Sequence, residues 1–184
     1  MVTSTEKLWA VADERGWTNT PPDHLSDSKV VPQGSWEENY KPWVFAEPTT
    51  DDGDVTTISY DFWSGYETYA VVWEYDPEQN MFLRSQGGEE HVDLNDDSRI
   101  KAANVVVLLT TEKGPIDELK HMLYDTIGTG EALIFQNGNA IEATWSKQSR
   151  TDELEFIDEK GNPVEMARGL TWISILNKIS TVDY

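Results

Sequence analysis

The sequence predicts a mostly β fold, either an antiparallel β-sandwich or a partly open barrel of roughly seven to nine strands. Between residues 55 and 176, short segments rich in β-branched and aromatic residues alternate with turn residues. An Asn-Gly pair joins two of these segments, and one apolar run is typical of a strand buried on both faces. The 184 residues suit a single β domain with a structured arm.

The first part of the chain, residues 1–50, is predicted to be a helix and an arm that pack on the β domain of residues 51–184. Residues 4–15 are expected to be helical, because a Ser or Thr can cap the start and Gly16 follows the end. Residues 17–48 contain five prolines with aromatic residues between them, which disfavours central strands. The aromatic residues either pin this arm to the domain, which we favour, or line an exposed ligand groove.

The β domain is predicted to contain a series of strands joined by turns. The expected strands are residues 55–62, 69–75, 81–86, 104–111, 131–136, 140–145, 154–157, 164–166 and 170–176. Turn residues predict three hairpins, around residues 76–80, 137–139 and 158–162. The segment 115–124 fits a helix that begins at a proline, whereas residues 121–127 fit a strand.

The composition restricts the classes of partner and site. The formal net charge of −20 argues against nucleic acid and anionic lipid as partners of this domain, and it favours solubility. The chain has no cysteine, so disulfides, thiol catalysis and Cys-ligated metals are excluded. No apolar run reaches the roughly 18 residues of a membrane-spanning helix, and the first residues do not resemble a signal peptide.

Seven short segments occur in a characteristic order: Trp73–Pro77, Phe82–Ser85, His91–Asp93, Ala103–Val107, Gly128–Ala132, Thr144–Lys147 and Arg168–Ile173. Their order and spacing resemble the C-terminal domain of the YerB-like bacterial lipoproteins, a family of unknown function. The resemblance runs from about Val55 to Leu176, and the opening residues 3–8 look like the junction with the family's first domain.

The resemblance implies a parent protein with a signal peptide, a lipidated cysteine and an N-terminal domain. It therefore implies a secreted protein on the extracellular face of the cell membrane. Attachment to the membrane would occur only through the lipid anchor, which is absent from this chain. The family has no established catalytic residues, so the resemblance assigns none here.

Arg84, His91 and Asp93 form the densest polar cluster of the sequence, and Asn104 follows soon after. If the strands that carry Arg84 and Asn104 share a sheet, these side chains gather at a strand end. An Arg can bind a carboxylate bidentately, and an Asp can orient a His as a base or ligand. The cluster is either a pocket for a carboxylate, phosphate or sugar, or a polar clasp on the neighbouring glycine loop, which we favour.

Trp145 and Lys147 are a second candidate, and Arg150 adds another positive charge. An aromatic face beside cations suits a sugar or an anionic polymer. Alternatively, Trp145 belongs to the core and the two cations are solvated at a strand end. We favour this structural interpretation.

No metal site, cofactor or catalytic residue is predicted. His24, His91 and His121 lack the spacing of a zinc site, and the oxygen-rich loop Asp93–Asp97 lacks the EF-hand pattern. No nucleophile motif is present. The 34 acidic residues guarantee accidental carboxylate pairs, so no glycosidase pair can be selected.

The expected function is a non-catalytic binding or accessory module at the cell envelope. Its possible partners are a cell-wall polymer, an envelope protein and the N-terminal domain of the parent protein. The alternative is a hydrolase-type enzyme that acts on an envelope polymer, with its site around Arg84, His91 and Asp93. That alternative predicts that the three side chains converge in a cleft open to solvent. A third possibility is that the domain only scaffolds the N-terminal domain.

Overall fold

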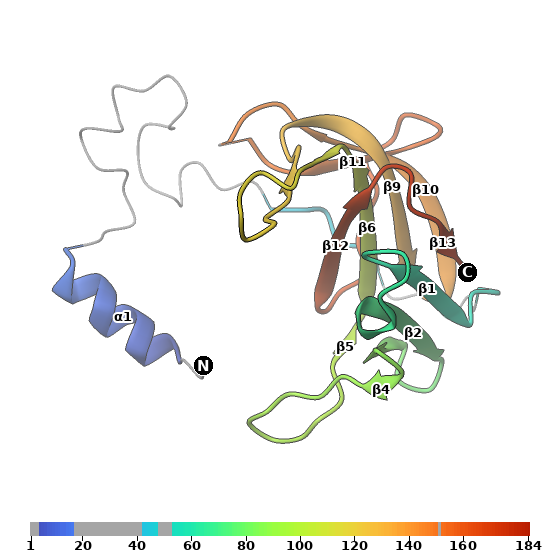
Figure 1. Ribbon diagram of the computed structural model, residues 1–184. Helices are drawn as coiled ribbons and strands as arrows, with labels where there is room; N and C mark the ends of the chain where they lie inside the picture. The colour runs from blue at the N-terminus through green and yellow to red at the C-terminus, as the bar shows by residue number, and fades with distance from the viewer. Residues whose placement is uncertain (1–3, 17–41, 48–52, 151) are drawn as a thin grey trace. The chain divides into compact units, whose positions relative to one another are not determined.

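The computed structural model describes residues 4–16, 42–47, 53–150 and 152–184 (Figure 1). The chain divides into two compact units, one of residues 1–42 and 149–153, the other of residues 43–148 and 154–184. The helix belongs to the first unit and the strands belong to the second. Within the described ranges, no helix is long and apolar enough to cross a membrane.

The helix α1 spans Thr5–Glu14, which confirms the predicted N-terminal helix. The Ser4 hydroxyl accepts a hydrogen bond from the Lys7 backbone N–H at 3.4 Å, as an N-cap residue does. Leu8 and Trp9 are exposed. Most of the predicted arm, residues 17–41 and 48–50, lies outside the described residues, so its packing stays a prediction.

The strands of the described ranges form two large sheets and one small ribbon. The first sheet has the order β13-β1-β2-β3-β4, and β5 also pairs with β3. Its strands are β1 (Thr57–Asp61), β2 (Ala70–Asp76), β3 (Met81–Gln86), β4 (Glu89–Glu90), β5 (Lys101–Ala102) and β13 (Val182–Asp183), with the 3-10 turn η1 (Glu67–Tyr69) before β2. The second sheet has the order β11-β10-β9-β6-β12. Its strands are β6 (Asn104–Thr110), β9 (Gly128–Gln136), β10 (Asn139–Lys147), β11 (Glu155–Asp158) and β12 (Thr171–Asn177). The ribbon pairs β7 (Glu112–Lys113) with β8 (Leu123–Tyr124).

The two large sheets pack face to face around the main core. Alternate residues of the first sheet, including Ile58, Trp73 and Phe82, are fully buried. They pack against Val107 of β6 and Phe135 of β9 in one cluster. Burial of each large apolar side chain contributes about 1.5–3 kcal/mol. In the described ranges neither sheet closes into a barrel, so the mostly β prediction is confirmed and the sandwich is the form observed.

The second sheet is covered on its other face as well, which explains the apolar run of β6. Val106 lies in a second cluster with Trp145 of β10 and Met166. Trp43 packs at this cluster, and its indole N–H donates to the Leu154 carbonyl at 2.7 Å. The prediction that this strand is buried on both faces is therefore confirmed.

One strand pairing differs from the predicted antiparallel arrangement. β12 lies beside β6 in parallel, with Thr171 opposite Asn104 and Asn177 opposite Thr110, and Figure 1 shows the two strands side by side. Parallel neighbours require a long crossover connection. Here the chain leaves β6, forms β7 to β11 and then returns along β6.

The segment after Pro115 forms neither the helix of residues 115–124 nor the strand of residues 121–127 that the sequence allowed. The predicted helix is wrong, because the Asp117 side chain closes a turn by accepting the His121 backbone N–H at 3.1 Å. Leu119 is 79% exposed, so the apolar residues have no surface against which a helix could dock. The alternative strand is present only as the two residues of β8.

Candidate functional site

Arg84 and His91 lie together, as expected, at the inner side of the first sheet. Arg84 comes from β3, and one terminal nitrogen of its guanidinium contacts His91 Nδ1. The other terminal nitrogen donates to Gln86 Oε1 at 2.9 Å. Because a guanidinium can only donate, His91 Nδ1 must accept, and the neutral ring then carries its proton on Nε2.

Arg84 is buried, with a relative exposure of only 2%. It bridges the two sheets, because its guanidinium carbon lies 5.8 Å from the ring centre of Trp73 and 4.8 Å from that of Trp172. No carboxylate of the described residues forms an ion pair with Arg84, and its Nε has no hydrogen-bond partner there. The cation is therefore stabilised by aromatic rings and neutral acceptors.

Both titratable groups of this pair respond to burial. Burial lowers the pKa of the Arg84 guanidinium, while nearby Tyr60 acts in the opposite direction, and the group stays protonated at neutral pH. Burial, followed by the charge of Arg84, lowers the pKa of His91. The pair is thus one buried cation and one neutral imidazole.

Asp93 does not join this pair. Its carboxylate accepts hydrogen bonds from the backbone N–H of Asn95 at 2.7 Å and from the Asn95 amide at 2.6 Å. Asp96 similarly accepts the Ser98 backbone N–H at 3.0 Å. The side-chain hydrogen bond with Ser98, followed by this backbone hydrogen bond, lowers the pKa of Asp96. These carboxylates stabilise the turns of the loop between β4 and β5.

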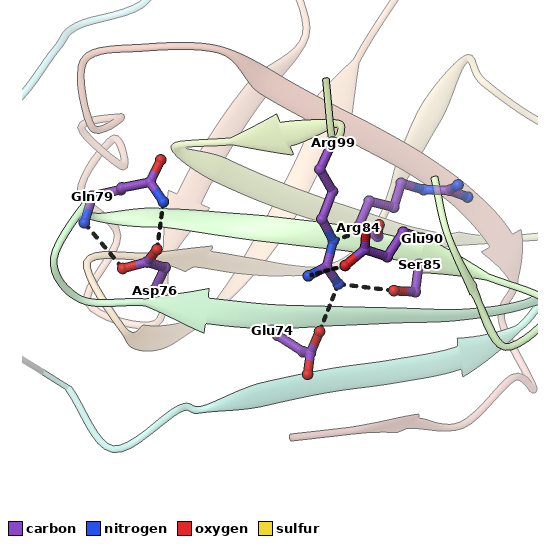
Figure 2. Close-up of polar contacts among 7 residues, drawn as sticks. All are labelled: Glu74, Asp76, Gln79, Arg84, Ser85, Glu90 and Arg99. Carbon is purple, nitrogen blue, oxygen red and sulfur yellow. Dashed lines mark hydrogen bonds and ion pairs between the residues drawn. The ribbon is translucent and has the colours of Figure 1, made fainter. Parts of the chain in front are cut away.

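A separate ion-pair cluster covers the outer face of the first sheet (Figure 2). Arg99 donates to Glu74 at 2.6 Å and to the Ser85 hydroxyl at 2.9 Å, and it lies 3.5 Å from Glu90. Figure 2 shows the Arg84 guanidinium directed away from this cluster. Neighbouring residues of β3 thus point to opposite faces, and the acids that neutralise Arg99 do not reach Arg84.

Asn104 is fully buried at the start of β6, in a different sheet from Arg84. Its amide donates to the Ala167 carbonyl at 2.8 Å and to Thr171 Oγ1 at 3.1 Å. Its oxygen accepts the Ala167 backbone N–H at 2.9 Å. The condition for Asn104 to gather with Arg84, that their two strands share a sheet, is therefore not met, and the Asn104 amide clamps the segment before β12.

Trp145 and Lys147 line a small apolar pocket of about 280 Å³, to which β6, β10 and β12 of the second sheet contribute. Trp145 is 2% exposed, and its indole N–H donates to the Leu109 carbonyl at 3.1 Å. The Trp145 ring therefore belongs to the core and also forms part of the pocket wall. A ligand role for the two residues stays a prediction.

A much larger cleft, of about 770 Å³, lies beside β1 and β13. We call it the aromatic cleft, because Tyr60, Phe62, Trp63 and Tyr66 are among its lining residues. Trp63 is 39% and Tyr66 is 64% exposed, whereas Tyr60 is buried. The cleft thus presents aromatic surface to solvent at a concave site, as ligand pockets commonly do.

The aromatic cleft is held by contacts that reach from the core to the surface. The Tyr60 hydroxyl is hydrogen-bonded to Ser174 Oγ at 2.7 Å, and burial raises its pKa. Tyr60 contacts Phe62 edge-on at 5.8 Å between ring centres, and Trp63 contacts Tyr69 in the same way at 4.8 Å. The β1–β2 connection is therefore a packed turn, which fixes the exposed rings.

One acid in the wall of the aromatic cleft is also fixed. Glu112 of β7 accepts the Tyr124 hydroxyl at 2.5 Å, and Asn177 donates to it at 3.5 Å. Burial and the neighbouring Glu112 raise the pKa of Tyr124 to about 12. Tyr124 therefore remains a protonated donor to this carboxylate at neutral pH.

In the described ranges, no three His, Cys, Asp or Glu side chains come together in a way that could hold a metal ion. His91 and His121 contact Arg84 and Asp117, respectively, and His24 lies outside the described residues.

Residues 58–173 match the family model described as the C-terminal domain of a protein of unknown function, DUF3048. The chain belongs to this family. The crystal structure of the YerB protein from Bacillus subtilis is similar, with a TM-score of 0.72, at 20% sequence identity. The match covers 99% of this chain and 55% of that protein, so the chain spans about half of its length. No curated protein matches the chain.

For the DUF3048 C-terminal domain, the comparison with YerB shows a shared fold. The segments that carried the resemblance to YerB-like proteins contain much of the structural framework. Trp73, Arg84 and Trp172 meet between the two sheets, and Asn104 and Trp145 make the hydrogen bonds given above. Because these motif residues lie in the core, their resemblance to the family reflects the shared fold and assigns no reaction.

The residues of the aromatic cleft were missed by sequence reasoning in this DUF3048 domain. Trp63 and Tyr66 lie between two predicted strands, where an aromatic residue is not needed for strand formation. Exposed aromatic residues in a connection are a signal that could have indicated them. The contribution of β13, which is only two residues long, had no comparable signal.

Proposed function

We propose that the domain is a non-catalytic binding or accessory module of the cell envelope, and that its ligand occupies the aromatic cleft. The observation that carries this proposal is a concave site of about 770 Å³ with exposed Trp63 and Tyr66 in its wall. Such a volume lies within the roughly 300–1,000 Å³ of typical ligand pockets. The packed connection supports it further, because rings that are fixed beforehand lose less conformational entropy on binding.

The proposed setting is the extracellular face of the membrane, with the parent protein secreted and anchored by a lipid. This part of the proposal rests on the resemblance to YerB-like lipoproteins. Its possible partners are a cell-wall polymer, an envelope protein and the N-terminal domain of the parent protein. Each of these would reach the aromatic cleft from solvent.

A hydrolase site around Arg84, His91 and Asp93 has less support. Arg84 is buried and contacts His91, while Asp93 is engaged by Asn95 in its own loop. The required convergence in an open cleft is therefore missing among these three side chains. The geometry supports a structural role for the Arg84–His91 pair, so binding remains the better proposal.

The proposal is tested by filling the aromatic cleft. Thr181 is exposed and lines the cleft, so Thr181→Trp places a bulky ring there. Thr144 is also exposed but lies on β10, outside the cleft lining, which makes Thr144→Trp a matched control. The wild-type domain and both variants are screened on arrays of wall glycans, peptides and purified envelope proteins.

We expect a ligand that binds the wild type and Thr144→Trp but not Thr181→Trp. Circular dichroism and thermal unfolding establish that both variants are folded. Absence of any binding, or binding that Thr181→Trp does not weaken, would contradict the proposed site.

A further inference from the structure

The aromatic cleft has an unbalanced charge. Its lining includes the acids Asp61, Glu112 and Asp183 and contains no Lys, Arg or His. Within the described ranges, the carboxylates of Asp61 and Asp183 have no hydrogen-bond or ion-pair partner. Both residues are exposed, so their charges are hydrated and available to a ligand.

The pairing of β1 with β13 brings these two acids to the same face of the sheet. Ser59 lies opposite Asp183, and Tyr60 lies opposite Val182. Asp61 is two residues beyond Ser59, so Asp61 and Asp183 are diagonal neighbours on one face. Diagonal cross-strand positions are about 7–8 Å apart, a spacing at which one cationic group between them can interact with both.

The aromatic rings complement these acids. Trp63 and Tyr66 are exposed in the same lining, and Trp63 is held by its 4.8 Å edge contact with Tyr69. The face of a Trp or Tyr ring attracts ammonium and guanidinium groups. Aromatic faces beside unpaired carboxylates are therefore suited to organic cations, and the net charge of −20 would attract a basic partner over a longer range.

We propose that the occupant of the aromatic cleft is a lysine- or arginine-bearing segment of a partner protein. This inference rests on the proposed function, because it requires that the cleft binds a ligand. The volume of about 770 Å³ is large enough for several side chains rather than one small amine. An oligosaccharide, which the rings alone would also accept, is the competing outcome of the test.

The experiment measures binding of three probes by isothermal titration calorimetry at about 0.15 M salt, where longer-range charge effects are screened. The probes are a blocked hexalysine peptide, a blocked hexaglutamate peptide and the tetramer of N-acetylglucosamine. The variants are Trp63→Ala and the double variant Asp61→Asn/Asp183→Asn. The matched control is Asp97→Asn/Glu159→Asn, which removes the same number of charges from exposed residues outside the cleft lining.

We expect the domain to bind hexalysine and not hexaglutamate. Loss of the two cleft carboxylates should raise Kd for hexalysine about fivefold to twentyfold, from two exposed ion pairs. Trp63→Ala should raise it roughly threefold or more, through loss of a cation–π contact. The control should change Kd by less than about twofold, because it alters only the overall charge.

Equal effects of the cleft and control double variants would overturn the inference, since binding would then follow net charge alone. Binding of the sugar tetramer that requires Trp63 but not the two carboxylates would also overturn it, while the proposed function would stand. Failure of all three probes, or indifference of binding to every cleft variant, would count against both.

Discussion

The clamp around Ala167 allows a quantitative test of how the segment before β12 is held. The Ala167 backbone N–H has two side-chain acceptors, Asn104 Oδ1 at 2.9 Å and Gln136 Oε1 at 2.8 Å. Asn104 also donates to the Ala167 carbonyl at 2.8 Å, and Gln136 donates to the Glu165 carbonyl at 2.9 Å. Removal of one side chain therefore leaves the N–H with an acceptor, whereas removal of both leaves it with none.

The expected losses follow from this count of hydrogen bonds. Asn104→Ala removes a donor from a buried carbonyl and leaves a small cavity, which lowers the free energy of unfolding by about 2–3 kcal/mol. Gln136→Ala should lower it by about 1–2 kcal/mol. The double variant should lose about 1–2 kcal/mol more than the sum, because only there is the buried Ala167 N–H unsatisfied.

The assay is urea unfolding of the wild type, both single variants and the double variant, followed by tryptophan fluorescence. Asn95→Ala is the control, since its exposed amide contacts only Asp93 within a loop, and it should change the free energy by less than about 0.5 kcal/mol. Strict additivity of the two single losses would refute the shared-donor explanation. A loss below about 0.5 kcal/mol for Asn104→Ala would refute the clamp itself.

Three further predictions concern the buried pair and the packing of the second sheet. In urea unfolding, the free energy of unfolding of Arg84→Met should exceed that of Arg84→Ala by about 2–4 kcal/mol, because Met fills the space between the two Trp rings without a buried charge. Equal losses in the two variants would show that the cation is essential. Since the pKa of His91 is lowered in the folded state, only the unfolded state gains its proton as the pH first falls below 6.5. The free energy of unfolding should therefore fall by at most about 1.4 kcal/mol per pH unit as the pH decreases. Urea unfolding of the wild type and His91→Gln between pH 7.5 and 5.5 checks this, because the variant should lack the contribution of His91 to the pH dependence. Gly130→Ala should destabilise the domain by about 1–3 kcal/mol in thermal unfolding, because an added Cβ would lie 2.6 Å from Trp145 Nε1. Gly161→Ala is the control, since its Cβ would meet no atom within 4 Å and the variant reports only the cost of a positive φ.

Local signals in the sequence predicted two of the three hairpins, because turn residues act over a few positions. The third hairpin lacks its second strand, since the predicted strand 164–166 is not formed and only isolated bridges occur at Pro163 and Met166. Asp76 accepts the backbone N–H groups of Glu78 at 2.9 Å and Gln79 at 3.1 Å, which closes the turn between β2 and β3. Figure 2 shows the contact with Gln79. Asn137 and Gly138 both have positive φ, as the turn between β9 and β10 requires. In both cases the chemistry of the turn sets the register of the strands that follow.

Long-range order was not accessible in the same way. β6 and β12 have the composition of strands, but their parallel pairing joins residues such as Asn104 and Thr171 that are 67 positions apart. The helix expected after Pro115 failed for a related reason, since a short amphipathic segment forms a helix only where a surface covers its apolar side. Such choices depend on the packing of the whole domain.

The aromatic cleft was not predicted, and the candidate residues that the sequence singled out come together only in part. Arg84 and His91 were paired correctly, and Trp145 and Lys147 share one pocket. Asp93, by contrast, is engaged by its own loop, because an Asp side chain readily bonds to a backbone N–H two residues on. Proximity in the sequence therefore indicated which side chains were candidates for contact, and local hydrogen bonding decided which of them made it.

The sequence by itself determined the mostly β class, the first helix, the hairpins β2–β3 and β9–β10, and the family, because each depends on short patterns of apolar, turn and capping residues. Only the tertiary structure decided that β13 lies beside β1 and that Asp61, Asp183 and Trp63 share a cleft. Strand order across a sheet depends on the burial of distant side chains against one another. The cleft at the edge of the sandwich follows from that strand order, so no single segment of the sequence predicts it.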